Sequence, residues 1–149
     1  MKKLFITLMA SLAIISCGNT AADWEKRYTG AWALEGMAGL DMHTIRTSSN
    51  AELADAIDDK LDTDIPFRTI DIRKGFVAQY TESGLLNQGT YTVYDDGTVT
   101  MDWEGDHHFT YWMYTRDSYL YMIEFQTDED GNDLRNQHAF RYYKTKRQY

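Results

Sequence analysis

Apolar and polar residues alternate over short stretches along most of the chain, and clusters of Gly, Asp and Asn separate these stretches. The stretches are rich in Tyr, Trp, Thr, Val and Ile, which is typical of antiparallel strands with one buried face. The pattern predicts eight strands, over residues 28–34, 67–73, 76–82, 89–94, 98–103, 107–115, 119–127 and 134–144. We therefore expect an all-β domain.

One segment, 49–62, follows a helical period instead. Leu53 and Ile57 lie four residues apart, and aspartates occupy the positions opposite them. Ser49 and Glu52 have the spacing of a capping box, in which each side chain bonds to the backbone of the other residue. We expect a single amphipathic helix in the long connection between the first two strands.

The register of one hairpin follows from its apolar positions, because residues that pair across two strands share a face. A three-residue loop at 95–97 pairs Val93 with Val99 and Tyr91 with Met101. A two-residue turn would instead pair apolar with polar residues. The pattern therefore favours the three-residue loop.

A second hairpin invites the same interpretation. A three-residue loop at 73–75 pairs Ile72 with Phe76 and Ile70 with Ala78. We expect the two hairpins to share one design.

Extending the apolar face over all strands gives one inner set. Its members are Trp32, Ile70, Ile72, Phe76, Ala78, Tyr80, Tyr91, Val93, Val99, Met101, Trp103, Phe109, Tyr111, Met113, Tyr121, Ile123, Phe125, Phe140 and Tyr142. Meander strands can bury such a face by closing into a barrel, which also removes both sheet edges. A sandwich of two sheets is the alternative, and the absence of long crossovers favours the barrel. We expect an eight-stranded antiparallel up-and-down (lipocalin-like) barrel, with one short amphipathic helix inserted between strands one and two.

Short motifs in this layout resemble those of lipocalin and lipocalin-like proteins. Gly30 and Trp32 match the glycine-x-tryptophan signature of the first lipocalin strand. The resemblance implies that Trp32 plugs the closed end of the barrel and that residues 35–66 form a lid over the open mouth. The chain departs from the family in two respects. The lipocalin C-terminal helix is missing after the last expected strand, and no arginine can be assigned to pack over Trp32, although Arg135 and Arg141 are candidates.

The N-terminal residues have the pattern of an export signal that ends in lipid attachment. Two lysines precede an uncharged apolar run, Leu4–Ile15, and small residues flank Cys17, which is the only cysteine. The stretch from Ile14 to Cys17 resembles the bacterial lipobox, which implies acylation of Cys17. A plain secretory signal cut after residues 20–22 is the alternative. A membrane-spanning helix fits least, because spanning takes about 20 apolar residues.

This interpretation divides the chain into a lipoprotein signal peptide (1–16), a lipidated tether (17–27) and a lipocalin-like β-barrel domain (28–149). It places the protein in the envelope of a Gram-negative bacterium, where Gly18 after the cysteine favours the outer over the inner membrane. The formal net charge is −8, so we expect no nucleic-acid partner and membrane attachment through the acyl anchor. With Cys17 acylated, no internal disulfide can form, and hydrophobic burial must stabilise the domain.

The interior decides whether the barrel holds a ligand, since eight strands can be filled by their own side chains or can hold one small molecule. Inward tyrosines carry hydroxyls that need partners when buried. The candidate ligand-binding residues are therefore Tyr80, Tyr91, Tyr111, Tyr121 and Tyr142. Weaker candidates lie in the lid segment: Leu40, Met42, Leu53 and Ile57.

Two functions stay open at this point. The first is a membrane-anchored barrel that binds a small apolar or aromatic ligand. The second is an envelope interaction or inhibitor protein, with a solid barrel that contacts a partner protein through its outer surface and loops. An outer apolar stripe bears on this choice, comprising Trp112, Tyr114, Leu120 and Met122. Either the helix at 49–62 or the segment around Trp24 covers this stripe, or a partner protein does.

Patterns for catalysis or metal binding are poor. His107 and His108 are adjacent, so a regular strand points them to opposite faces. The acidic run at 128–133 resembles a calcium loop, but its glycine comes at the fourth position rather than the sixth, and a polar hairpin turn explains it better. His138 falls on the inner face by alternation, where a lone histidine is more often a hydrogen-bonded residue than a base. No nucleophile motif or phosphate loop is present, so we expect no enzyme activity, no metal and no cofactor.

Overall fold

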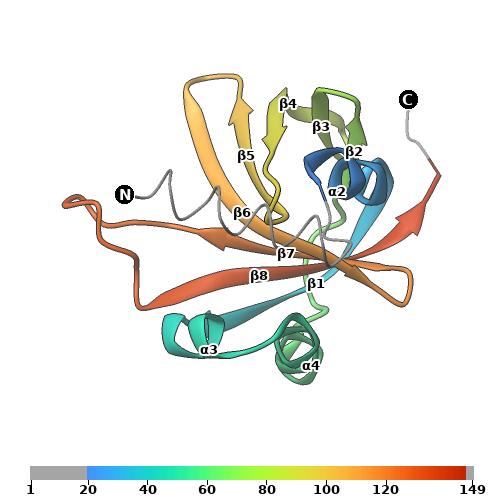
Figure 1. Ribbon diagram of the computed structural model, residues 1–149. Coiled ribbons are helices and arrows are strands. Elements are labelled where there is room, and N and C mark those ends of the chain that lie inside the picture. Colours follow the sequence, from blue (N-terminus) through green and yellow to red (C-terminus); the bar gives the residue numbers. More distant parts are fainter. Residues whose placement is uncertain (1–19, 147–149) are drawn as a thin grey trace.

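The structure is a computed structural model in which residues 20–146 are described. In this range eight antiparallel strands close into one barrel, in which each strand pairs with its sequence neighbours and the last pairs with the first. The strands are β1 (Gly30–Asp41), β2 (Thr69–Arg73), β3 (Phe76–Thr81), β4 (Gly84–Val93), β5 (Thr98–Trp103), β6 (His107–Arg116), β7 (Tyr119–Phe125) and β8 (Asn136–Thr145). The up-and-down barrel is confirmed, and the sandwich is excluded (Figure 1).

Within the described residues, three helices accompany the barrel: α2 (Ala21–Tyr28), α3 (Met42–Thr47) and α4 (Asn50–Lys60). The helix predicted over 49–62 is α4, and its capping box between Ser49 and Glu52 is present. Figure 1 shows α3 and α4 together on one side of the barrel, below β1 and β8. The connection between β1 and β2 therefore lies along the barrel wall.

The lid expected over residues 35–66 is not formed. β1 continues to Asp41, and the weaker ligand candidates Leu40, Met42, Leu53 and Ile57 are buried together in a cluster outside the barrel. The outer face of the barrel is apolar there, with Tyr114, Ile123 and Ala139 in the same cluster. Covering this wall removes its apolar surface from water, which stabilises the packed helices.

The segment expected as a tether contains α2, which lies across one end of the barrel. The Trp24 indole N–H donates to the carbonyl oxygen of Asp95 at 3.0 Å. The Tyr28 hydroxyl lies 2.9 Å from the Gly97 carbonyl oxygen and 2.7 Å from that of Met113. We call this end, which α2 covers, the closed end, and the opposite end the mouth.

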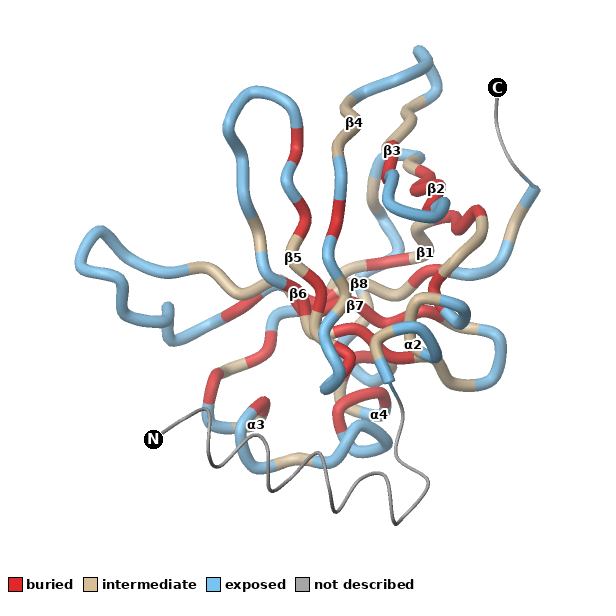
Figure 2. The backbone as a smooth tube through the Cα atoms, turned by 45° about the horizontal axis from the view of Figure 1, so that its top comes forward, coloured by how far each residue is buried: buried red, intermediate tan, exposed pale blue. Residues whose placement is uncertain are grey.

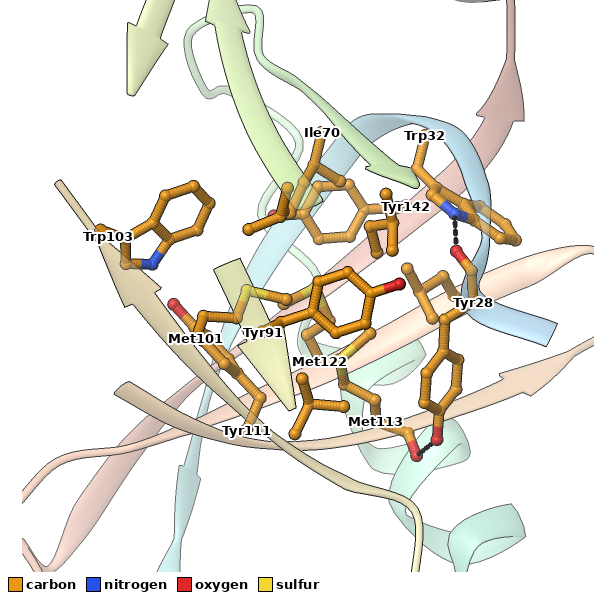
Figure 3. Close-up of a cluster of buried hydrophobic side chains, with 14 residues drawn as sticks. Tyr28, Trp32, Ile70, Tyr91, Met101, Trp103, Tyr111, Met113, Met122 and Tyr142 are labelled. Atoms are coloured by element: carbon orange, nitrogen blue, oxygen red, sulfur yellow. Dashed lines mark hydrogen bonds between the residues drawn. The ribbon is translucent and has the colours of Figure 1, made fainter. Parts of the chain in front are cut away.

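Trp32 lies buried at the closed end, with 3% of its surface exposed, as the resemblance implied. Its indole N–H donates to the Tyr28 carbonyl oxygen at 2.9 Å (Figure 3). The cation over its ring is Lys144, whose Nζ lies 4.4 Å from the ring centroid. The two candidate arginines lie elsewhere: Arg141 packs on Tyr119, and Arg135 lines a separate surface pocket.

The register predicted for the β4–β5 hairpin is confirmed. Val93 pairs with Val99, and Tyr91 pairs with Met101. Gly97 has a φ of +90°, in the left-handed region that glycine adopts without strain. Apolar and polar residues alternate strictly over Thr90–Val93 and over β5, so only one register keeps the faces of this hairpin apart.

The register predicted for the β2–β3 hairpin is wrong by one residue. Ile72 pairs with Val77, because the chain turns on two residues and Gly75 has a φ of +73°. Val77 is fully buried, whereas Phe76 is 37% exposed. The inner face therefore carries Val77 and Gln79, and the predicted inner residues Phe76, Ala78 and Tyr80 do not belong to it. Two adjacent apolar residues made either register acceptable.

The faces of β7 are also reversed with respect to the prediction. Asp117 and Ser118 both have positive φ, as in a type I′ turn, and Met113 pairs with Met122. Leu120 and Met122 consequently lie inside the barrel. The predicted inner residues Tyr121, Ile123 and Phe125 lie in or against the outer cluster. Because β7 is apolar on both faces, alternation could not distinguish them.

α4 covers the outer stripe, which confirms the covering interpretation for Trp112 and Tyr114. The Trp112 indole N–H donates to the Asn50 side-chain oxygen at 2.9 Å. Asp58 accepts hydrogen bonds from Arg116, Arg141 and Tyr121. In Figure 2 the buried part of α4 lies against the barrel, whereas the tips of the mouth connections are exposed.

Substitutions at two glycines of the barrel wall, Gly89 and Gly39, test its packing. Gly89 pairs with Trp103, and a methyl group at Gly89 would overlap the carbonyl oxygen of Asp102. At Gly39 a methyl group would meet no atom within 4 Å. We expect Gly89→Ala to lower the free energy of unfolding by about 1–3 kcal/mol.

Gly39→Ala is the matched control, and it should leave stability unchanged or raise it by less than about 1 kcal/mol. Urea denaturation of the form lacking residues 1–17 measures both variants. Equal stabilities for the two variants would contradict the register of β4 and β5.

Candidate ligand-binding site

The barrel interior has a filled half and an open half. Near α2 the side chains of Trp32, Ile72, Met101 and Met113 are buried in one cluster (Figure 3). At the mouth lies a cavity of about 250 Å³. Its apolar lining consists of Leu34, Trp103, Phe109, Met122 and Phe140, and its polar lining of Arg68, Gln79, Asn87, His107, Tyr111, Glu124 and Tyr142.

Two polar groups of the cavity are paired with each other. Tyr111 and Glu124 stand opposite one another on β6 and β7, so both side chains point into the barrel. The Tyr111 hydroxyl donates to Glu124 Oε2 at 3.2 Å, and the Gln126 amide donates to Glu124 Oε1. Both carboxylate oxygens therefore already accept a hydrogen bond.

Arg68 differs from the other polar groups of the cavity. It lies just before β2, and its backbone oxygen accepts from the Leu34 N–H at 2.9 Å. Its Nε is buried and has no hydrogen-bond partner among residues 20–146. Leaving a buried donor unpaired costs about 1–3 kcal/mol, and more for a charged group. Among the side chains that line the cavity, this nitrogen is the buried donor that has no hydrogen-bond partner.

The phenols of the cavity are neutral donors. Burial raises the pKa of Tyr142 well above its usual range; the Arg68 cation opposes this increase, and the Glu124 carboxylate adds to it. Burial, with the nearby Glu124 charge, likewise raises the pKa of Tyr111. At neutral pH both phenols are therefore protonated and can donate hydrogen bonds.

Two of the five tyrosines predicted to bind a ligand line this cavity, Tyr111 and Tyr142. Tyr91 lies inside the barrel but nearer the closed end, where its hydroxyl donates to the Arg73 carbonyl oxygen at 2.6 Å. Tyr121 lies beneath α4 and donates to Asp58 at 2.9 Å, because β7 presents its other face to the interior. Tyr80 lies on the outer face of β3, because the β2–β3 register differs by one residue from the predicted one, and it does not line the cavity.

Sequence reasoning missed Arg68 and Glu124. Glu124 lies two residues after Met122, so the correct register of β7 would have placed it inside. Arg68 lies two residues before Ile70 in the predicted strand 67–73, and Ile70 belongs to the predicted inner set. Extending the alternation by one step would therefore have placed this arginine on the inner face.

The remaining polar candidates are arranged as turns and surface groups. His107 lines the cavity, whereas His108 pairs with Asp102 on the outer face, so the two rings point apart as predicted. In the run at 128–133, Asp128 accepts from the backbone N–H groups of Asp130 and Asn132, which closes a turn. His138 is exposed at the rim of the mouth. Among residues 20–146, no three His, Cys, Asp or Glu side chains are placed to hold a metal ion.

The segment predicted as a lipoprotein signal peptide (1–16) and the predicted acylation site Cys17 lie outside the described residues. None of the helices in the described range is both long and apolar enough to cross a bilayer. Comparison of the chain with protein-family models, curated proteins and solved structures finds no match. The fold and the site define a closed eight-stranded β-barrel with one small cavity at its mouth.

Alkaline titration tests the environments of two further tyrosines. Burial raises the pKa of both Tyr91 and Tyr121 from 10.0 to about 12, and for Tyr121 the bond to Asp58 adds to the increase. The unfolded chain loses these protons near pH 10, whereas the folded chain keeps them to about pH 12. The contribution of these two phenols to stability should therefore be constant below pH 10 and be lost as the pH rises toward 12.

The double variant Tyr91→Phe, Tyr121→Phe should reduce this slope, even though losing two hydrogen bonds lowers stability at every pH. Chemical denaturation at a series of pH values separates the slope from the offset. A slope equal to that of the unchanged protein would show that these two phenols titrate normally.

Proposed function

We propose that this chain is a lipid-anchored envelope protein whose barrel binds one small molecule in the mouth cavity. The observation that carries the proposal is the unpaired, buried Nε of Arg68 beside an open space of about 250 Å³. A ligand that accepts a hydrogen bond from this nitrogen would remove the cost of leaving it unpaired.

The size and lining of the cavity suggest the class of ligand. Ligand pockets measure about 300–1,000 Å³, so a cavity at the lower limit suits a small molecule rather than a long lipid chain. Trp103, Phe109 and Phe140 offer an apolar, largely aromatic wall. Since Glu124 is already hydrogen-bonded, Arg68 is the group available to an anion. We assign to the site a small apolar or aromatic molecule that carries one acidic group.

Native mass spectrometry of the form lacking residues 1–17 tests ligand binding, by recording co-purified molecules and added small aromatic carboxylates. Trp103 lines the cavity, so tryptophan fluorescence gives a second measurement of binding. Arg68→Gln should weaken carboxylate binding about tenfold or more, as expected for the loss of a charge-assisted hydrogen bond. The control Arg46→Gln, at an exposed ion pair with Asp133, should bind normally. Protein that is always empty, with unchanged fluorescence, would refute the proposal.

Attachment to the membrane is tested separately. The sequence around Cys17 resembles a lipobox, so Cys17→Ala should release the protein from the membrane fraction and abolish the acyl mass at the N-terminus. Fractionation of cells and mass spectrometry of the mature protein measure these two effects. Unchanged fractionation of the variant would refute the acyl anchor while leaving ligand binding intact.

One specific observation supports the alternative function, which is contact with a partner protein. The outer stripe cannot serve, because α4 covers Trp112 and Tyr114 while Leu120 and Met122 face inward. Exposed apolar side chains lie instead at the mouth: Phe67 and Leu134 in its connections, and Leu85 and Leu86 at the start of β4. A partner protein that closes the mouth would contact these residues.

A further inference from the structure

The beginning of the described chain is fixed to the closed end of the barrel. The Ala21 N–H donates to Asp95 Oδ1 at 2.8 Å, and the Trp24 indole donates to the Asp95 carbonyl oxygen at 3.0 Å. Asp95 belongs to the connection between β4 and β5, at the closed end. Any segment that precedes α2 therefore starts beside this connection.

The sequence distance from this point to Cys17 is short. Thr20, the N-cap of α2, follows Cys17 by three residues. Three residues extend by at most about 11 Å. β4 runs from mouth to closed end over ten residues, which corresponds to about 33 Å of strand and, with the tilt of a barrel strand, about 25 Å of height. An acyl group on Cys17 can therefore bring the closed end to a bilayer, but it cannot bring the mouth there.

The charges of the two ends agree with this orientation. The connections at the mouth are acidic: those after β5 and β7 contain Glu104, Asp106, Asp128, Glu129, Asp130 and Asp133, with Arg135 as their only basic residue. The closed end carries more basic residues, which are Lys26, Arg27, Arg73, Lys74, Lys144 and Lys146. The acidic residues of the same end nearly balance them, so the closed end is close to neutral, whereas the two mouth connections are strongly negative; these acidic residues are Asp23, Glu25, Asp71, Asp95, Asp96 and Asp117. An anionic bilayer repels the acidic mouth more strongly than the closed end, and it attracts the exposed lysines of the closed end.

Exposed aromatic side chains are also found at the closed end. Phe76, Tyr94 and Tyr143 are 37%, 46% and 42% exposed. Aromatic rings are favoured at the interface between membrane and water, where one edge is apolar and the other wet. The mouth exposes apolar side chains as well, so exposure alone does not select an end. The short sequence distance and the charges do.

We propose that the closed end is the face that docks on a membrane containing anionic lipids, and that the mouth opens away from the bilayer. This proposal rests on the acyl anchor of the proposed function. It adds a second contact, between the exposed lysines of the closed end and the lipid headgroups. The ligand of the cavity would then enter from the aqueous compartment rather than from the bilayer.

Site-specific fluorescence tests the orientation in the full acylated protein, reconstituted in vesicles of phosphatidylethanolamine and phosphatidylglycerol. Because acylation consumes the thiol of Cys17, an introduced cysteine is the only free one. We would place a fluorophore at Phe76→Cys or Tyr94→Cys for the closed end, and at Leu85→Cys or Asp130→Cys for the mouth. All four residues are exposed. Lipids with a nitroxide in the headgroup region then quench only fluorophores that touch the membrane surface.

We expect strong quenching at both closed-end positions and none at the mouth. The charge contribution is tested with Lys26→Glu and Lys74→Glu, each of which should lower the ratio of docked to undocked protein about fivefold or more. The matched control is Lys60→Glu, an exposed residue in the last turn of α4. Raising the salt concentration should have the same effect as the two closed-end substitutions.

The possible results separate this proposal from the one on which it rests. Acylated protein that floats with the vesicles but is quenched at the mouth, or equally at both ends, would overturn the orientation and leave the anchor standing. Protein that carries no acyl mass and does not float would overturn the anchor, and the orientation with it. Quenching confined to the closed end, weakened by the two closed-end charge reversals but not by Lys60→Glu, supports the proposal.

Discussion

The pairing of β1 with β8, from Ala31–Thr145 to Asp41–Asn136, turns a meander into a barrel. Without this pairing both outer strands would expose unpaired N–H and C=O groups along a sheet edge. β1 is twelve residues long, whereas β2 has only five. β1 consequently pairs with β2 near the closed end alone, and its second half continues without that neighbour. The cavity lies beside this gap, where Leu34 and Arg68 meet.

Hydrophobic burial occurs on both faces of the same wall. The inner cluster fills the closed half of the barrel, and the outer cluster lies between the barrel wall and the two helices α3 and α4. Asp58 fixes α4 to the wall through Arg116, Arg141 and Tyr121, so the helix is held by charge as well as by apolar contact. Two clusters that share one wall give a domain without a disulfide more buried surface than one barrel interior could supply.

The sequence predicted those parts of the fold in which polar and apolar residues alternate strictly. The β4–β5 register followed from Val93 and Val99, and α4 followed from its period and capping box. Prediction failed where two adjacent residues were both apolar, as at Phe76 and Val77, or where a strand was apolar on both faces, as in β7. The site suffered from the same ambiguity, because a charged residue such as Glu124 is recognised as internal only when the register is known.

α2 covers the closed end of the barrel, and it begins only a few residues after Cys17. As a helix its eight residues span about 12 Å, and as an extended chain they would span about 27 Å. In an acylated chain, the tether can therefore become longer only if α2 unwinds and no longer covers the closed end. Lifting the barrel away from the membrane by more than the short leading segment allows would unwind α2, withdraw Tyr28 from Gly97 and Met113, and open the floor of the barrel.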